Sequence, residues 1–114
     1  MNPSSSIGLT AIFSALADPS RRAILERLSI EKEATVSELA EPLDMSLPAV
    51  SKHLKVLERA GLLNRRRDGK SFYLKLNPRP LKEAGEWISY YEQFWSESLD
   101  RLEDFLLKDE QAND

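Results

Sequence analysis

The chain has 114 residues and no cysteine, with 16 basic and 19 acidic side chains that give a net charge of −3. This length suits one domain that folds without covalent cross-links. The lack of cysteine excludes disulfides and thiolate metal sites. No stretch approaches the roughly 18 apolar residues of a membrane span, and the first residues lack the pattern of a signal peptide. We therefore expect a soluble, cytoplasmic protein with no membrane partner.

The charge is divided unevenly along the chain. Residues 46–79 carry 9 basic and 2 acidic side chains, a net charge of +7, whereas residues 80–114 carry 3 and 10, a net charge of −7. A concentration of positive charge in one short segment is typical of a surface that binds nucleic acid. The acidic segment is more simply explained as the solvated face of a helix.

Two helices are predicted first, with a proline between them. A short amphipathic helix runs from Thr10 to Ala17. Asp18 then favours an N-cap and Pro19 the first helical position, where its missing N–H costs nothing. Ile24 and Leu28 lie four apart on one face of the helix that follows. Its first turn also holds Arg21 and Arg22, whose charges oppose the helix dipole, so we expect them to have partners. Arg21 could pair with an acidic residue or contact DNA, and the structural role is favoured.

The next two predicted helices are joined by a very short turn. Thr35–Glu38 has the pattern of a capping box, and the apolar residues Val36, Leu39, Ala40 and Leu43 form one stripe of a two-turn helix. After the turn at Asp44-Met45, Ser46 caps a helix that ends at Gly61, a glycine suited to the C′ position. The apolar stripe of that helix consists of Val50, Leu54 and Leu57. Two helices in this arrangement form a helix-turn-helix.

The second helix of this pair has a broad polar face whose residues are small or basic. Small residues let a helix approach base edges, and lysines meet phosphates. We expect these residues to face a DNA groove: Ser46, Pro48, Ala49, Ser51, Lys52, His53 and Lys55. His53 is the only histidine, and a metal site needs three or four ligands. It is therefore expected either to form local hydrogen bonds or to contact a phosphate.

A β-hairpin is predicted after this helix, with Asp68-Gly69 as its turn. An Asp-Gly pair between two alternating runs is a strong hairpin signal. The period of two places Phe72, Leu74 and Leu76 on the inward face. The tip carries four basic residues, which are expected to bind phosphates. They are Arg65, Arg66, Arg67 and Lys70. A basic hairpin that directly follows such a helix is a wing.

One long helix is predicted from about Leu81 to Lys108. Its apolar residues follow a heptad-like spacing and include Trp87 and Trp95. A winged helix of this size cannot cover so much aromatic surface alone, so a partner chain is implied. We expect residues 10–108 to form one domain, with a flexible lead at 1–9 and a frayed tail at 109–114.

Two segments resemble the signature of regulators of the arsenical-repressor (ArsR) family. Residues 16–25 read LADPSRRAIL, and residues 46–57 read SLPAVSKHLKVL, followed by AGLL and the arginine-rich hairpin. The resemblance covers roughly residues 10–106, with the elements in matching order. It implies a mainly α fold with a β-hairpin wing, namely a winged helix-turn-helix with a long C-terminal dimerisation helix.

The same resemblance implies a function. Such a protein is a homodimeric repressor, sometimes of its own operon, that binds double-stranded DNA at an inverted-repeat operator. The helix at 46–60 enters the major groove, the hairpin contacts the backbone or minor groove, and the first and last helices form the dimer interface. The interface residues expected here are Ile12, Phe13, Leu16, Trp87, Ile88, Tyr91, Phe94, Trp95, Leu99 and Leu102.

The chain departs from the metal-sensing members of this family. The helix before the turn has no cysteine pair, and the last helix has no histidine. We therefore expect no metal and no other cofactor, and no catalytic motif indicates an enzyme. Two alternatives stay open. One is a site for a small apolar effector among the aromatic residues of the last helix, and the other is a winged helix used only for protein assembly, which the +7 segment disfavours.

Overall fold

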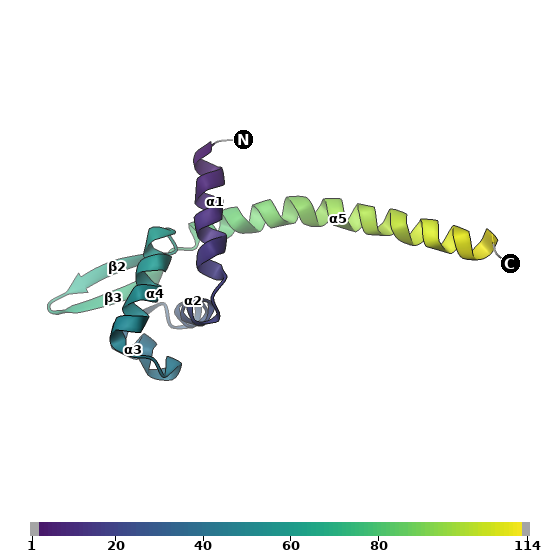
Figure 1. The fold of residues 1–114 in the computed structure, drawn as a ribbon. Coiled ribbons are helices and arrows are strands. Elements are labelled where there is room, and N and C mark those ends of the chain that lie inside the picture. The colour runs from purple at the N-terminus through teal and green to yellow at the C-terminus, as the bar shows by residue number, and fades with distance from the viewer. Residues whose placement is uncertain (1–2, 113–114) are drawn as a thin grey trace. The chain divides into compact units, whose positions relative to one another are not determined.

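A computed structural model describes the backbone of residues 3–112 and the side chains of residues 8–110. The elements in chain order (Figure 1) are α1 (Pro3–Leu16), α2 (Pro19–Glu31), β1 (Glu33–Thr35), α3 (Val36–Ala40), the 3-10 helix η1 (Glu41–Leu43), α4 (Leu47–Arg59), β2 (Leu63–Asp68), β3 (Ser71–Leu76) and α5 (Arg79–Ala112). Residues 1–84 and residues 85–114 form two units. The expected fold, mainly helical with a hairpin and a long last helix, is confirmed. No helix within the described part of the chain has the length and apolar character needed to cross a membrane.

Three helices begin at the residues that the sequence predicts. The carboxylate of Asp18 accepts a hydrogen bond from the Arg21 backbone N–H at 3.0 Å and caps α2. The Thr35 hydroxyl accepts from the Glu38 N–H at 3.2 Å and caps α3. Ser46 caps α4 by accepting from the Ala49 N–H at 3.3 Å. Each cap satisfies an N–H that has no partner within its helix.

Three boundaries differ from the prediction. Helix α1 begins at Pro3, within the lead that was expected to be flexible, and residues 1–2 lie outside the described residues. Helix α5 continues to Ala112, past the expected start of fraying, with residues 113–114 outside the described part. Helix α3 changes into η1 after Ala40, since Pro42 has no N–H for the α-helical bond to the Glu38 carbonyl.

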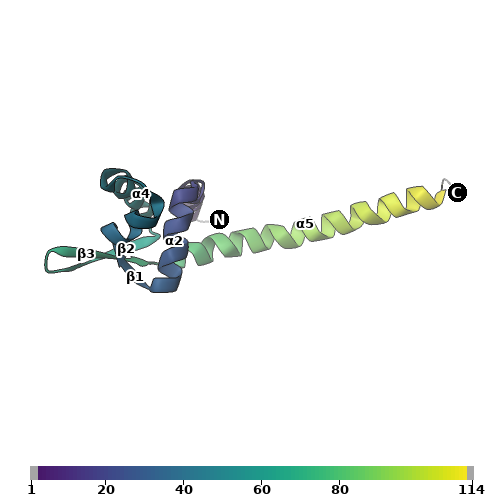
Figure 2. The ribbon, with the colours of Figure 1, turned by 90° about the horizontal axis from the view of Figure 1, so that it is seen from below.

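The three strands form an antiparallel sheet in the order β1-β3-β2 (Figure 2). Strand β1 was not predicted from the sequence, where its residues look like part of a polar linker. It pairs Ala34 with Leu74, and both side chains are buried. In the hairpin, Asp68 pairs with Ser71, so the turn is Gly69-Lys70, one residue later than predicted. Gly69 has a φ of +62°, which glycine adopts without steric cost.

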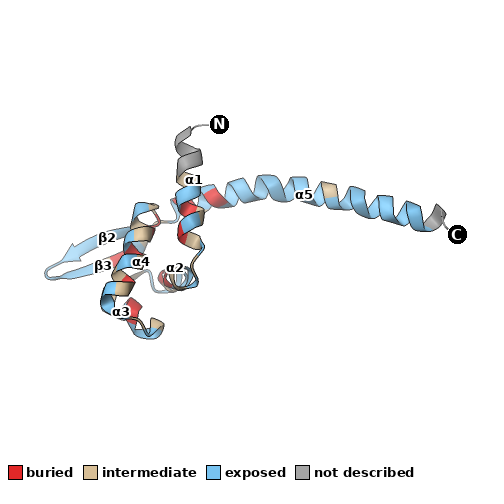
Figure 3. Cartoon of the chain, in the orientation of Figure 1, coloured by how far each residue is buried: buried red, intermediate tan, exposed pale blue. Residues whose placement is uncertain are grey.

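The core lies between the end of α1, α2, α3, α4 and the sheet, and its buried positions are red in Figure 3. Its fully buried large side chains include Ile24, Leu28, Leu39, Val50, Leu54, Leu57, Leu62 and Leu74. Phe72 lies on the same face of β3 as the buried Leu74, as predicted, but it is 40% exposed. The hairpin continues beyond the core at this point. The guanidinium groups of Arg65 and Arg67 lie 5.3 Å and 5.8 Å from the Phe72 ring centroid instead.

Candidate nucleic-acid interface

The helix-turn-helix consists of α3, η1, a left-handed residue and α4. The turn residue Asp44 has φ of 50° and ψ of 46°, a conformation that aspartate tolerates better than most residues. Leu39 and Ala40 on one side and Val50 and Leu54 on the other are buried in the same core. The orientation of α4 relative to α3 is therefore fixed by packing as well as by the turn.

Helix α4 buries one face and exposes the other. Val50, Leu54 and Leu57 are each 0% exposed. The predicted groove-facing residues divide into two groups: Ser46, Pro48, Lys52 and Lys55 are exposed, whereas Ala49, Ser51 and His53 are half-buried. The two lysines therefore present their ammonium groups to solvent, where they can contact phosphates.

His53 has local partners that join α4 to the start of α2. Its Nδ1 lies 3.3 Å from Nη1 of Arg21 and 3.8 Å from the carboxylate of Asp18. The backbone N–H of Arg21 holds the pKa of the Asp18 carboxyl below its usual value, and the nearby His53 lowers this pKa further. Local hydrogen bonding, one of the two alternatives expected for His53, is thus what the geometry provides.

The two arginines in the first turn of α2 also have structural partners. Arg21 donates from Nε to the Ala15 carbonyl at 2.7 Å and from Nη2 to the Ser14 carbonyl at 3.1 Å. Arg22 donates to the Leu16 carbonyl at 2.7 Å. These carbonyls belong to the last turn of α1, where the helical hydrogen bonds end, and the Ser14 carbonyl also accepts from the Ala17 N–H at 3.2 Å. Both arginines therefore stabilise the junction between α1 and α2.

Two of the four basic side chains of the wing are held by carboxylates. Arg65 pairs with Glu58 of α4 at 2.6 Å. Arg66 donates to both carboxylate oxygens of Glu33 in β1, at 2.9 Å and 3.2 Å. The Arg66 hydrogen bond lowers the pKa of Glu33, and that pairing raises the pKa of Arg66. The Glu58 pair brings the hairpin to α4, and the Glu33 pair joins it to β1.

The other two basic residues of the wing, Arg67 and Lys70, are not held by carboxylates of the described residues. Arg67 donates from Nε to the Gly69 carbonyl at 3.0 Å. No ion pair involves Arg67 or Lys70 among the residues that the structure describes, and both side chains are exposed. The charges available to a phosphate at the tip are therefore those of Arg67 and Lys70.

Leu47 is a surface residue that was not predicted from the sequence to belong to the interface. It occupies the first position of α4 and is 51% exposed. An apolar side chain at this end of a groove-entering helix can contact the methyl group of thymine. The signal in the sequence was its place beside the Ser46 cap, outside the apolar stripe of α4.

The last helix exposes most of its apolar side chains. The expected interface residues Trp87, Ile88, Tyr91, Phe94, Trp95, Leu99 and Leu102 are all exposed. Some of these rings contact each other, with centroid distances of 4.6 Å for Trp87 and Tyr91 and 5.9 Å for Phe94 and Trp95. The expected residues of α1 differ: Ile12 is buried within its own chain, which removes it from an interface, while Phe13 and Leu16 are half-buried.

The described residues contain no group of three or more histidine, cysteine, aspartate or glutamate side chains arranged to hold a metal ion.

Comparisons with known proteins relate most of the chain to regulators. A helix-turn-helix domain family matches residues 16–66. The chain is 47% identical over 85 residues to the uncharacterized HTH-type transcriptional regulator YuzN of Bacillus subtilis (strain 168), covering 68% of this chain and 92% of that protein. It is 34% identical over 77 residues to the transcriptional repressor SdpR of the same strain, covering 68% and 84%. A crystal structure of an ArsR family transcriptional regulator aligns with a TM-score of 0.71 at 38% identity, covering 84% of this chain and 95% of that one.

Proposed function

This chain belongs to the ArsR family of winged helix-turn-helix transcriptional regulators, and we propose that it represses transcription as a homodimer bound to an inverted-repeat operator. It is a DNA-binding regulator and not an enzyme. The repressor SdpR is among its relatives, which supports repression by blocking access of the polymerase. We expect it to act in the cytoplasm, where its DNA lies, and to regulate its own operon.

The observation that carries this proposal is the location of the positive charge. The segment 46–79, with its net charge of +7, forms α4 and the β2–β3 hairpin. Helix α4 has its apolar stripe fully buried, so its outer face is free, and that face carries Lys52 and Lys55. A surface built for protein assembly would expose several apolar anchors at this place, whereas Leu47 is the one large hydrophobic side chain of α4 that is exposed.

We assign the residues of this surface to two tasks. Lys52, Lys55, Arg67 and Lys70 contact phosphates, while the small or apolar residues at the start of α4 approach base edges: Ser46, Leu47, Pro48, Ala49 and Ser51. None of these can form the bidentate contacts that arginine, asparagine or glutamine make with bases, so phosphate contacts supply most of the affinity. Arg65 and Arg66 hold the wing in place, and His53 holds α4.

The exposed apolar face of α5 supports the homodimer. One chain presents a single recognition helix, α4, and one such helix is too little for tight and specific binding to DNA. A two-fold dimer places two such helices in successive major grooves, about 34 Å apart, and its operator then has the same symmetry. The aromatic residues of α5, with Trp95 near the middle of the exposed stripe, are the side chains we assign to this interface.

The test is to select operator DNA from random and genomic fragments with the purified chain, and then to map the bound site by footprinting. We expect an inverted repeat with half-site centres about 10 base pairs apart, and native mass spectrometry should find two chains on each operator. A bound site without two-fold symmetry, occupied by one chain, would contradict the dimer. Equal affinity for every fragment would contradict sequence-specific repression.

A further inference from the structure

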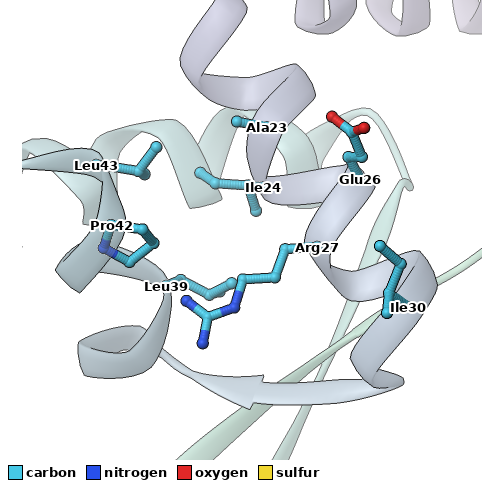
Figure 4. Close-up of a pocket in the computed structure, with 8 residues that line it drawn as sticks. All are labelled: Ala23, Ile24, Glu26, Arg27, Ile30, Leu39, Pro42 and Leu43. Carbon is cyan, nitrogen blue, oxygen red and sulfur yellow. The ribbon is translucent and has the colours of Figure 1, made fainter.

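A pocket of about 340 Å³ lies between α2 and the α3–η1 segment (Figure 4). Six of the residues around it are apolar: Ala23, Ile24, Ile30, Leu39, Pro42 and Leu43. The other two are Glu26 and Arg27. This volume is within the range of pockets that bind small molecules, about 300–1,000 Å³, and such pockets combine an apolar lining with a few polar groups.

The pocket has a buried floor and an uncovered apolar rim. Ile24 and Leu39 are core residues, each 1% exposed, whereas Ile30 is 77% exposed. In Figure 4 the guanidinium of Arg27 lies among the lining residues near Leu39, while the carboxylate of Glu26 lies at the edge. An apolar ligand on this floor would remove Ile30 from water, which is favourable.

Arg27 is fixed in place by two hydrogen bonds. Pro42 leaves the Glu38 carbonyl without its helical N–H, and Nη1 of Arg27 donates to that carbonyl. Its Nε donates to the Glu31 carboxylate at 2.9 Å. Among the hydrogen bonds that Arg27 forms with described residues, none involves Nη2. The pocket therefore contains a positioned donor with N–H groups left for a ligand.

The local charge decides which kind of acceptor fits this donor. Arg27 is already paired with Glu31, Glu26 lies at the pocket, and Glu41 borders an adjoining hollow that Arg27, Glu31 and Pro42 also line. An anionic ligand would meet this excess of carboxylates, and like charges repel. We infer that the pocket between α2 and α3–η1 binds a small, uncharged, mainly apolar molecule with one hydrogen-bond acceptor, of the ketone, ester or lactone class.

The location of the pocket connects it to DNA binding. Leu43 is the last residue of η1 and directly precedes Asp44 of the turn that leads to α4. A ligand packed against Leu39 and Leu43 bears on the segment that orients the recognition helix. This regulatory consequence rests on the proposed function, whereas binding itself does not, so the two are tested separately.

Binding is tested on the full chain without DNA, by two-dimensional ¹⁵N–¹H NMR with three probes of equal chain length: 2-octanone, octanoate and octylammonium. We expect 2-octanone to shift the amides of Ile30, Leu39 and Leu43 in a saturable way, and the two charged probes to bind more weakly. Tighter binding of octanoate or octylammonium would overturn the uncharged class. If no probe shifts these amides, or if the shifts fall only in α5, the pocket is not a ligand site.

Two variants locate the bound probe. Arg27→Met removes the donor but keeps the apolar stem, and should weaken 2-octanone binding about fivefold, the value of one hydrogen bond. Ala23→Leu fills the pocket from an exposed position on α2 and should abolish the saturable amide shifts caused by 2-octanone. Ser29→Leu, on the same helix but outside the lining, is the matched control and should bind normally. Unchanged binding in folded Ala23→Leu protein would overturn the assignment even if Arg27→Met fails to fold.

Discussion

Helices α4 and α5 both carry an apolar stripe, but only α4 buries it within its own chain. Val50, Leu54 and Leu57 of α4 are fully buried, whereas Trp95 and Leu99 of α5 are each 59% exposed. Their charges differ as well, because α4 belongs to the segment with +7 and most of α5 to the segment with −7.

This difference assigns the two helices to different tasks in the proposed function, α4 to DNA binding and α5 to assembly. A helix whose apolar stripe is buried within its own chain can offer its other face to a polar ligand such as DNA. A helix with an uncovered apolar stripe gains free energy only when a second surface covers it, since burial of apolar area is the main driving force of association. We therefore expect substitutions on the exposed face of α4 to change DNA affinity alone, and substitutions in the apolar stripe of α5 to change assembly first.

The largest effect is expected for Trp95→Ala in α5. Truncation of a tryptophan at the centre of an interface often costs at least about 2 kcal/mol, and a two-fold interface contains the residue twice, for about 4 kcal/mol in all. Sedimentation should show a shift toward monomer at low micromolar concentration. Operator binding should weaken much more than binding to non-specific DNA.

Tyr90→Ala is the matched control, because Tyr90 is also an exposed aromatic of α5 but lies outside the proposed interface set. It should leave the dimer intact. A folded Trp95→Ala protein that remains fully dimeric would show that another surface holds the two chains together.

The next effect concerns α4. The double variant Lys52→Ala, Lys55→Ala should weaken DNA binding by about 1–3 kcal/mol without changing the sedimentation of the dimer. Fluorescence anisotropy with labelled operator measures the affinity. Lys32→Ala, Lys82→Ala removes two exposed lysines from outside the basic segment and should bind nearly normally. Equal decreases in affinity for both double variants would indicate a general charge effect with no recognition surface on α4.

Two variants of the wing should change the salt dependence of DNA binding in opposite directions. Arg67→Ala, Lys70→Ala should lower the slope of log affinity against log salt by about one for each phosphate that the variant no longer binds, with little change in sequence preference. Glu33→Gln should act in the opposite direction, because it removes the carboxylate that binds Arg66 at 2.9 Å and leaves only the longer pair with Asp68 at 3.9 Å. A slope that neither variant changes would mean that the wing stays in solvent.

A smaller effect is expected at acid pH. The hydrogen bond from Arg66 lowers the folded-state pKa of Glu33, so the pair contributes stability above the unfolded pKa, about 4.3, and loses it as the pH falls through the folded value. Asp18 follows the same rule. Between about pH 5 and pH 2, the melting temperature should fall less in Glu33→Gln protein than in the wild type. An identical fall of the melting temperature in the variant and the wild type would mean that the Glu33–Arg66 pair has no effect on stability.

No effect is expected from metals. Zinc, cadmium or arsenite at micromolar levels should not release the operator, since the sequence has no thiol and one histidine. Gel-shift titrations with each metal measure this. Release that a chelator reverses would reveal a site built from carboxylates or shared between chains.

The sequence predicted those features that depend on neighbouring residues. The caps at Asp18, Thr35 and Ser46 follow from side chains within three residues of the N–H groups they satisfy. Strand β1 could not be predicted in this way, because its partner Leu74 lies far along the chain and only Ala34 of its three residues is buried.

Contacts between residues far apart in the sequence also could not be predicted in the candidate DNA-binding surface. The positive charge of the wing is visible in the sequence, and its concentration in one short segment indicated binding to phosphates. The pairing of Arg66 with Glu33, residues that are 33 positions apart, depends on the unpredicted strand. The sequence therefore indicated four equivalent basic residues, and the structure separates two that pair with carboxylates from two that form no ion pair with described residues.

The register of the hairpin has a consequence for how far the wing reaches. From the Arg66–Tyr73 pair to the Asp68–Ser71 pair, none of the paired residues is buried, and the turn is Gly69-Lys70. Adding two residues to each strand would lengthen the hairpin by about 7 Å and keep every side chain on its present face. Adding one to each would turn the tip residues over. The reach of this arm along a DNA backbone is therefore adjustable in steps of about two base pairs, without any change to the core.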